Sequence, residues 1–131
     1  MKSVVICGSS KFAEDARAFA KKLKELGVVV FEPHFYRASG GDWSRIHKFD
    51  EKFVALGLTH DHFYKIRMAD VVFIYNKDGY IGVSGSMEIG YAAALNKPMY
   101  ALSDKDPEIC RQVLFSGIVG TPDELVDKFL K

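Results

Sequence analysis

Short apolar runs alternate along the chain with segments in which apolar residues recur every three or four positions. The apolar runs predict buried strands, because strands covered on both faces lack polar alternation. They lie at residues 3–7, 28–33, 69–75, 97–102 and 117–120. The periodic segments predict helices, at residues 12–26, 46–68, from the glycine-rich stretch to residue 96, 106–115 and 121–131.

This strict alternation of strand and helix predicts an α/β fold. Right-handed crossovers between parallel strands give a doubly wound, five-stranded parallel sheet. We expect the flavodoxin-like strand order 2-1-3-4-5, within one domain that spans residues 1–131. Ligands bind such sheets beyond the carboxyl ends of the strands, where the strand order reverses. The loops after the first and third strands flank that point and should meet there.

Three local signals add detail to the predicted helices and loops. The helix over 46–68 should be broken near residues 57–59, with Thr59 as the cap of its second piece. Residues 34–45 form a connection longer than usual, which indicates a functional or mobile loop. The last helix should begin with a capping box made by Thr121 and Glu124.

Composition and charge restrict the class of protein. The 131 residues are 48% hydrophobic and 27% charged, with a formal net charge of +1. These values are typical of a globular domain and give no bulk field for a nucleic acid polymer or a membrane surface. No apolar run could span a bilayer, and Met1 leads directly into a strand, so we expect no signal peptide. Cys7 and Cys110 are predicted to be reduced, structural thiols of a cytoplasmic protein.

The loop after the first strand turns directly into a helix, and its sequence is Gly8-Ser9-Ser10-Lys11. Backbone N–H groups and hydroxyls there can face an anion at the positive end of the helix, and the lysine adds a cation. The simpler alternative is a tight turn with a serine cap. The loop has neither the G-x-G-x-x-G pattern of dinucleotide-binding folds nor the P-loop pattern.

The loop after the third strand, "GYIGVSGSMEIGYA" (79–92), places one carboxylate among glycines and serines. Glycines admit a ligand close to the backbone, and serines supply adjustable hydrogen bonds. The candidate binding residues are Tyr80, Gly82, Ser84, Gly85 and Ser86. We expect Ser84 or Gly85 to cap the next helix, with Glu88 in its first turn, where the helix dipole favours the ionised form.

The helical positions after this loop suggest where Glu88 points. An apolar face toward the sheet is predicted from Met87, Tyr91, Ala94 and Leu95, which leaves Glu88 at the rim near the reversal of strand order. The alternative is that Glu88 is half of a capping box and reaches back to the amide of the cap residue.

A sheltered, ionised carboxylate suits chemistry at an anomeric carbon. Cleavage of an N-glycosidic bond passes through a cationic, oxocarbenium-like state, which a carboxylate can stabilise or trap covalently. The serines of the first loop and Lys11 are candidates to hold a 5′-phosphate. Candidate aromatic walls for a base are Tyr80, Phe35, Tyr36 and Trp43.

The stretches "ICGSSKF" and "ADVVFIYNKDGYIGVSGSMEIGYAAALNKPMYAL" resemble the nucleoside 2-deoxyribosyltransferase-like superfamily, which includes 2′-deoxynucleoside 5′-phosphate N-hydrolases. The pattern G-x-x-x-E-x-G-[YF]-A, followed by K-P, carries the likeness. The resemblance implies a flavodoxin-like fold, a homodimer or larger assembly, and no metal or other cofactor. It also implies that Glu88 attacks the anomeric carbon and that Ser9 and Lys11 lie at the phosphate loop.

Three positions depart from the pattern of that superfamily. His62 stands where an aspartate is frequent, with Asp61 next to it, and a histidine can also bind a hydroxyl or donate a proton. A solvated helix histidine is the alternative. Val5 stands where a tyrosine is frequent in the first strand, and Gly82 stands where a serine or aspartate is common, with Ser84 as a possible substitute.

The leading hypothesis is N-glycosidase or glycosyl-transfer activity on a (deoxy)nucleoside or its 5′-monophosphate. Glu88 would be the nucleophile, His62 or Asp61 would assist, and both loops, including Gly8, would bind the small-molecule substrate. One alternative is a nucleotide-binding module without catalysis. Another is a structural domain in which Glu88 only caps its helix.

Overall fold

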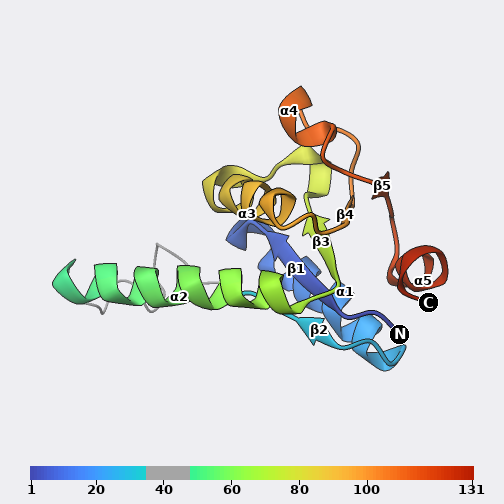
Figure 1. Ribbon diagram of the computed structural model, residues 1–131, viewed down its shortest axis with the longest axis horizontal. Coiled ribbons are helices and arrows are strands. Elements are labelled where there is room, and N and C mark those ends of the chain that lie inside the picture. The colour runs from blue at the N-terminus through green and yellow to red at the C-terminus, as the bar shows by residue number, and fades with distance from the viewer. Residues whose placement is uncertain (35–47) are drawn as a thin grey trace.

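The structure is a computed structural model, and it describes residues 1–34 and 48–131. These residues form a five-stranded sheet in which every neighbouring pair of strands is parallel (Figure 1). The order β2-β1-β3-β4-β5 confirms the predicted flavodoxin-like arrangement. The strands are β1 (Val4–Gly8), β2 (Val30–Phe31), β3 (Val71–Tyr75), β4 (Met99–Ala101) and β5 (Gly117–Ile118).

Helices connect consecutive strands, as the sequence pattern predicts. The helices are α1 (Ala13–Glu25), α2 (Lys48–Met68), α3 (Gly82–Ala94), α4 (Ile109–Gln112) and α5 (Pro122–Leu125). The short 3₁₀ turns are η1 (Ser10–Phe12) and η3 (Lys77–Gly79), and the π-helix η4 (Val126–Leu130) continues α5 to the end of the chain. Helix α4 is a single turn, much shorter than the predicted 106–115, because Asp106 accepts hydrogen bonds from the Glu108 amide and from Arg111 and holds the preceding residues in a turn.

The two faces of the sheet are covered by different helices. Alternate residues of a strand point to opposite faces, so Val4 and Ile6 of β1 pack with α1 and α5, whereas Val5 and Cys7 pack with α2 and α3. Cys7 therefore lies under the α2–α3 layer, at the end of its strand. Among the described residues, no helix is both long enough and apolar enough to cross a membrane.

Helix α2 runs without interruption over its 21 residues, which corrects the predicted break at 57–59. Thr59 does not cap a second piece, because its hydroxyl donates to the carbonyl of Ala55, 2.7 Å away, inside the helix. A helical glycine costs only about 1 kcal/mol, so Gly57 does not end the helix. The first half of α2 extends beyond the sheet in Figure 1. The predicted loop 34–45 falls, from residue 35 onward, outside the described residues.

The C-terminal helix begins nearly as predicted. The hydroxyl of Thr121 accepts a hydrogen bond from the amide of Glu124, 3.2 Å away, so Thr121 is the cap. The carboxylate of Glu124 accepts from the amide of Gly120, at 3.0 Å, rather than from the amide of Thr121 itself. In the expected capping box, Glu124 would accept from the amide of the cap residue, but the donor here is the residue before the cap.

The connection from β3 to α3 is held against the segment after β4. The buried side chain of Asn76 donates to the carbonyl of Ser103 and accepts from its amide, at 3.0 and 2.8 Å. Gly79 has a φ of +83°, and a Cβ atom on it would lie 2.2 Å from the carbonyl oxygen of Lys105. Only glycine fits there, and this fixes the path of the chain into α3.

We predict that Gly79→Ala lowers the free energy of unfolding by more than about 2 kcal/mol, because both the positive φ and the backbone clash oppose a methyl group. Gly90, inside α3, is the matched control, since a Cβ on it meets nothing within 4 Å. Gly90→Ala should raise the free energy of unfolding by about 0.5–1 kcal/mol. Urea unfolding measures both, and equal effects of the two changes would contradict the assignment.

Candidate active site

A cavity of about 380 Å³ lies beyond the carboxyl ends of β1 and β3. Both loops singled out in the sequence line it, with Gly8, Ser9 and Ser10 on one side and residues 80–84 on the other. The middle of α2 forms a further wall, through Ala55, Leu58, Thr59, His62 and Phe63. These positions repeat at helical spacing, so they share one face of α2 only because the helix continues unbroken through Gly57.

Helix α3 begins earlier than the sequence predicts. Its first residue is Gly82, after Ile81, so Ser84 and Gly85 lie inside the helix and do not cap it. Glu88 is therefore the seventh residue, in the second turn, and the first turn contains no acidic residue. The proposed capping-box role of Glu88 is wrong, because its side chain lies a full turn away from the helix start.

The face of α3 that meets the sheet also differs from the predicted one. Its buried residues are Gly85, Glu88, Ile89 and Ala92, whereas Met87 and Leu95 are exposed. Gly85 packs directly on the side chain of Ile81, the residue that precedes the helix, since a Cβ on Gly85 would lie 2.6 Å from Cγ2 of Ile81. Glu88 thus sits on the buried face rather than at the rim, and only 9% of its surface is exposed.

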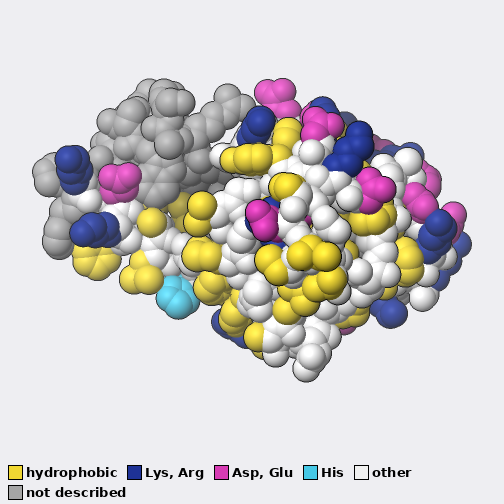
Figure 2. Space-filling view, turned by 90° about the horizontal axis from the view of Figure 1, so that it is seen from above, with side chains coloured by type: hydrophobic (Ala, Val, Ile, Leu, Met, Phe, Trp, Pro, Cys, Tyr) yellow, Lys and Arg dark blue, Asp and Glu magenta, His cyan; other side chains and the backbone are white. Residues whose placement is uncertain are grey.

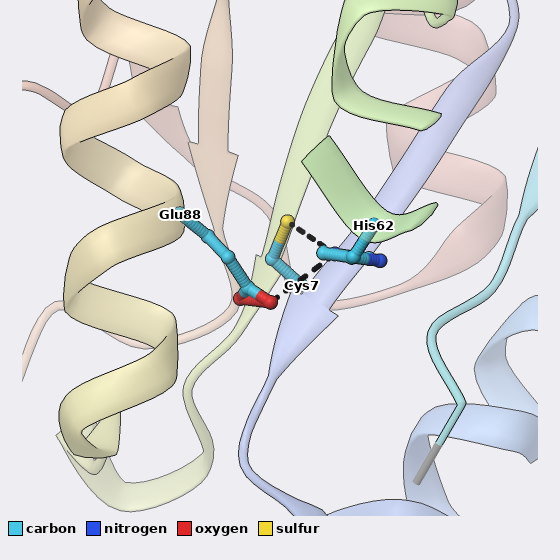
Figure 3. A group of neighbouring side chains, drawn as sticks. All are labelled: Cys7, His62 and Glu88. Carbon is cyan, nitrogen blue, oxygen red and sulfur yellow. Dashed lines mark hydrogen bonds and ion pairs between the residues drawn. The ribbon is translucent and has the colours of Figure 1, made fainter. Parts of the chain in front are cut away.

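Glu88 lies in a compact cluster with His62 and Cys7 (Figure 3). The three side chains come from α3, α2 and β1. The Nε2 atom of His62 lies 3.3 Å from Oε1 of Glu88 and 3.3 Å from Sγ of Cys7. His62 is 6% exposed, so the alternative of a solvated histidine is wrong. Within the described chain, Oε2 of Glu88 and Nδ1 of His62 have no hydrogen-bond partner.

Burial dominates the electrostatics of this cluster. It raises the pKa of Glu88 to about 8, and it is the largest cause that lowers the pKa of His62 to about 4, with Lys65 adding to it. At neutral pH both groups are therefore mainly uncharged, and their 3.3 Å contact joins two neutral groups rather than an ion pair. The expectation that the helix dipole keeps Glu88 ionised is wrong: the dipole contributes about 1 kcal/mol within the first turn, whereas the rise in pKa to about 8 corresponds to roughly 5 kcal/mol.

The strand-1 loop forms the tight turn that the sequence left open as an alternative. The hydroxyl of Ser9 accepts a hydrogen bond from the amide of Lys11, at 3.1 Å, and caps η1. Ser10 is exposed and lines the cavity. The ammonium of Lys11 lies 4.6 Å from the centre of the Tyr80 ring, so the lysine is placed over an aromatic residue of the cavity wall.

Other predicted residues point elsewhere. The hydroxyl of Ser86 donates to the carbonyl of Gly82 and accepts from Arg111, so it faces α4. The carboxylate of Asp61 lies 2.8 Å from Nζ of Lys65 and does not line the cavity. Gly82 and Ser84 do line it, and Gly82 has a φ of +81°. The predicted aromatic walls Phe35, Tyr36 and Trp43 fall outside the described residues.

The rim of the cavity is apolar where α3 begins. Val83 and Met87 line the cavity and are 81% and 50% exposed. Figure 2 looks onto the molecule from the side on which α4 lies in Figure 1, and it shows hydrophobic side chains gathered near the middle of this face. Exposed apolar surface of this kind is typical of ligand-binding grooves and protein contacts.

Cys7 belongs to this cluster, although its sequence position did not predict a place beside Glu88 and His62. It was interpreted as a structural thiol, and it is buried. Two signals could have revealed its position: it precedes the serine loop by one residue, and the alternation along β1 directs it to the same face as α2 and α3.

Comparisons with known proteins give the fold alone. No protein-family model and no curated protein sequence matches the chain. Among solved structures, the chain is similar to the Clostridium botulinum CMP N-glycosidase BcmB, with a TM-score of 0.51 and 17% identity over 96% of each chain. The similarity extends over nearly the whole of both proteins, which shows that they share the α/β architecture.

The two cysteines should differ sharply toward a thiol reagent. Burial raises the pKa of Cys7 well above its usual value, and thiolates rather than thiols react, whereas Cys110 is exposed. In the native protein a colorimetric thiol reagent should label Cys110 alone, and Cys7 should react only after denaturation. Native labelling that persists in Cys110→Ser would show that Cys7 is accessible and would contradict the geometry of the cluster.

Proposed function

We propose that this protein cleaves or transfers the N-glycosidic bond of a nucleoside or nucleoside 5′-monophosphate. The observation that carries the proposal is the carboxyl group of Glu88 at a ligand-sized cavity, with Oε1 beside His62 and Oε2 without a partner in the described chain. The cavity volume of about 380 Å³ lies in the range that small-molecule sites occupy. Similarity in fold to a CMP N-glycosidase supports the same class of reaction.

The residues of the cluster suggest distinct roles in such a reaction. Neutral His62 carries one N–H proton, and Nε2–H can donate it to Oε1 once Glu88 is ionised. Oε2 is buried in this structure, so it attacks after the side chain of Glu88 turns toward the cavity. His62 is thus a positioning residue for the carboxylate. A carboxylate in a site of low dielectric interacts strongly with positive charge that develops on the sugar.

The proposed reaction has two steps, formation of a glycosyl ester on Glu88 and its hydrolysis. Oε2 of ionised Glu88 forms a bond to the anomeric carbon as the carbon–nitrogen bond breaks, and the bonding pair leaves with the base, which takes a proton from water. Water then attacks the glycosyl ester, which gives the free sugar and returns the carboxylate. A second base that attacks instead of water gives transfer.

The binding end of the cavity is proposed from the two loops. Ser10 and the first residues of α3 line the cavity, and Lys11 adds a cation above Tyr80. We propose the hydroxyls and backbone N–H groups of these residues as the donors. These donors would receive a phosphate or the sugar hydroxyls. The apolar side chains at the rim, Val83 and Met87, would lie against the base.

We expect Glu88→Gln to reduce the rate of base release by about 10²–10⁴-fold or more, because an amide neither attacks nor stabilises the sugar cation. Base release is followed by chromatography across a panel of nucleosides and 5′-monophosphates. Glu51→Gln, at an exposed position on α2, is the matched control and should leave the rate unchanged. Activity that survives in Glu88→Gln ends the assignment, and a ligand that raises the melting temperature without being consumed supports the non-catalytic binding module.

The pH dependence follows from the state of Glu88. Because burial raises the pKa of Glu88 to about 8, the nucleophilic carboxylate is the minor form at neutral pH and becomes the major form above that value. The kcat/KM for a nucleoside should therefore rise with pH and level off above about pH 8, measured in buffer with a metal chelator. A rate that falls over the same range would show that the protonated form of Glu88 acts instead, as a general acid.

A further inference from the structure

The Cys7–His62–Glu88 cluster combines a thiol, an imidazole and a carboxyl group in one buried place. Their ligand atoms all lie within 4.8 Å of one another. We propose that these three side chains bind a divalent cation of the zinc class, and that the bound cation occupies the inner end of the cavity. The proposed reaction does not require this cation. Binding of the cation can therefore be tested whether or not the proposed function is correct.

The spacing of the atoms suits tetrahedral coordination. Zinc binds sulfur at about 2.3 Å and nitrogen or oxygen at about 2.0–2.1 Å, so neighbouring ligand atoms around it lie about 3.3–3.6 Å apart. The Nε2 atom of His62 lies 3.3 Å from both Sγ of Cys7 and Oε1 of Glu88. The third pair, Sγ of Cys7 and the carboxylate oxygen of Glu88, lies within 4.8 Å, so a cation can enter once side-chain rotations bring that pair to the tetrahedral spacing.

Hydrogen bonding alone leaves this cluster incompletely satisfied. Nε2 carries either one proton or one lone pair, so it makes one good hydrogen bond, although it has two neighbours at 3.3 Å. Oε2 of Glu88 has no partner within the described part of the chain. A cation would satisfy the sulfur, the nitrogen and the carboxylate at once.

Charge and donor type select the class of cation. Binding of a doubly charged ion would release the thiol proton of Cys7 and the proton of Glu88 where it is present. Thiolate and carboxylate then balance the two positive charges, and the buried site stays neutral overall, which limits the cost of burial. One sulfur and one nitrogen donor favour zinc-class ions over Mg²⁺ or Ca²⁺, which require mostly oxygen ligands.

The cavity provides both access and a fourth coordination position. His62 and Glu88 line the cavity, whereas Cys7 lies behind them. Three protein ligands with an open position describe catalytic rather than structural zinc sites. Here the same carboxylate is the proposed nucleophile, so an occupied site would withhold Glu88 from the sugar. That consequence, inhibition by the cation, rests on the proposed function.

The test uses cobalt as a spectroscopic probe for the zinc class. Chelator-treated protein is titrated with Co²⁺ and, separately, with Zn²⁺ by calorimetry, without any nucleotide present. We expect one equivalent to bind, with a thiolate-to-cobalt band in the near ultraviolet. Cys7→Ser should abolish that band, and Cys7→Ser and His62→Gln should each weaken binding at least about 100-fold, since the loss of even a supporting partner costs 10–100-fold.

Matched controls exist in the chain. Cys110→Ser removes the other, exposed thiol, and His60→Gln removes an exposed histidine two residues from His62; neither should change the affinity or the band. Circular dichroism establishes that each variant is folded, and Cys7→Ala serves if Cys7→Ser does not fold. A cobalt band that persists in Cys7→Ser, or no binding by the parent protein, overturns the site. Base release without binding rejects the metal site alone, and binding without base release rejects the proposed function alone.

Discussion

The burial of Glu88 against His62 is the contact on which the rest of the site depends. A carboxyl group at this depth is tolerated only as the neutral acid or with a partner, and the structure supplies a histidine that is itself neutral. Three features of the backbone bring the contact about. Gly85 lets the first turn of α3 pack on Ile81, the alternation along β1 places Cys7 beneath, and the unbroken α2 carries His62 over both. Two of these features, strand β1 and helix α2, lie far from Glu88 in the sequence.

Most of the fold could be predicted because its signals are local. Continuous apolar runs identify doubly covered strands, and the crossover rule leaves few ways to order them, so the sheet was predictable down to its strand order. The ends of the helices were not. Ser84 is a far better cap than Ile81 by intrinsic preference, yet α3 begins at Gly82, after the buried side chain of Ile81, and Gly85 packs on that side chain. The start of this helix therefore does not follow the capping preferences of its residues.

The sequence predicts where the candidate site lies in the fold, but not which side chains surround Glu88. Strand order alone brings the loops after β1 and β3 together, and both line the cavity. The partners of Glu88 depend on contacts across long stretches of chain: 55 residues separate Cys7 from His62. The direction of the pKa shift of Glu88 was predicted wrongly. A position in the first turn of a helix favours the carboxylate anion, whereas its actual position, in the second turn on the buried face, favours the neutral acid.

A carboxyl group whose anion is destabilised by burial has a particular chemical consequence. The same loss of water that raises its pKa also strengthens its attraction to any positive charge that enters the cavity. An oxocarbenium-like sugar and a zinc-class cation both supply such a charge, the first transiently and the second persistently. The burial of Glu88, His62 and Cys7 is therefore the common basis of both proposals. A permanently ionised glutamate on the surface would bind either partner more weakly, since water would already solvate its charge.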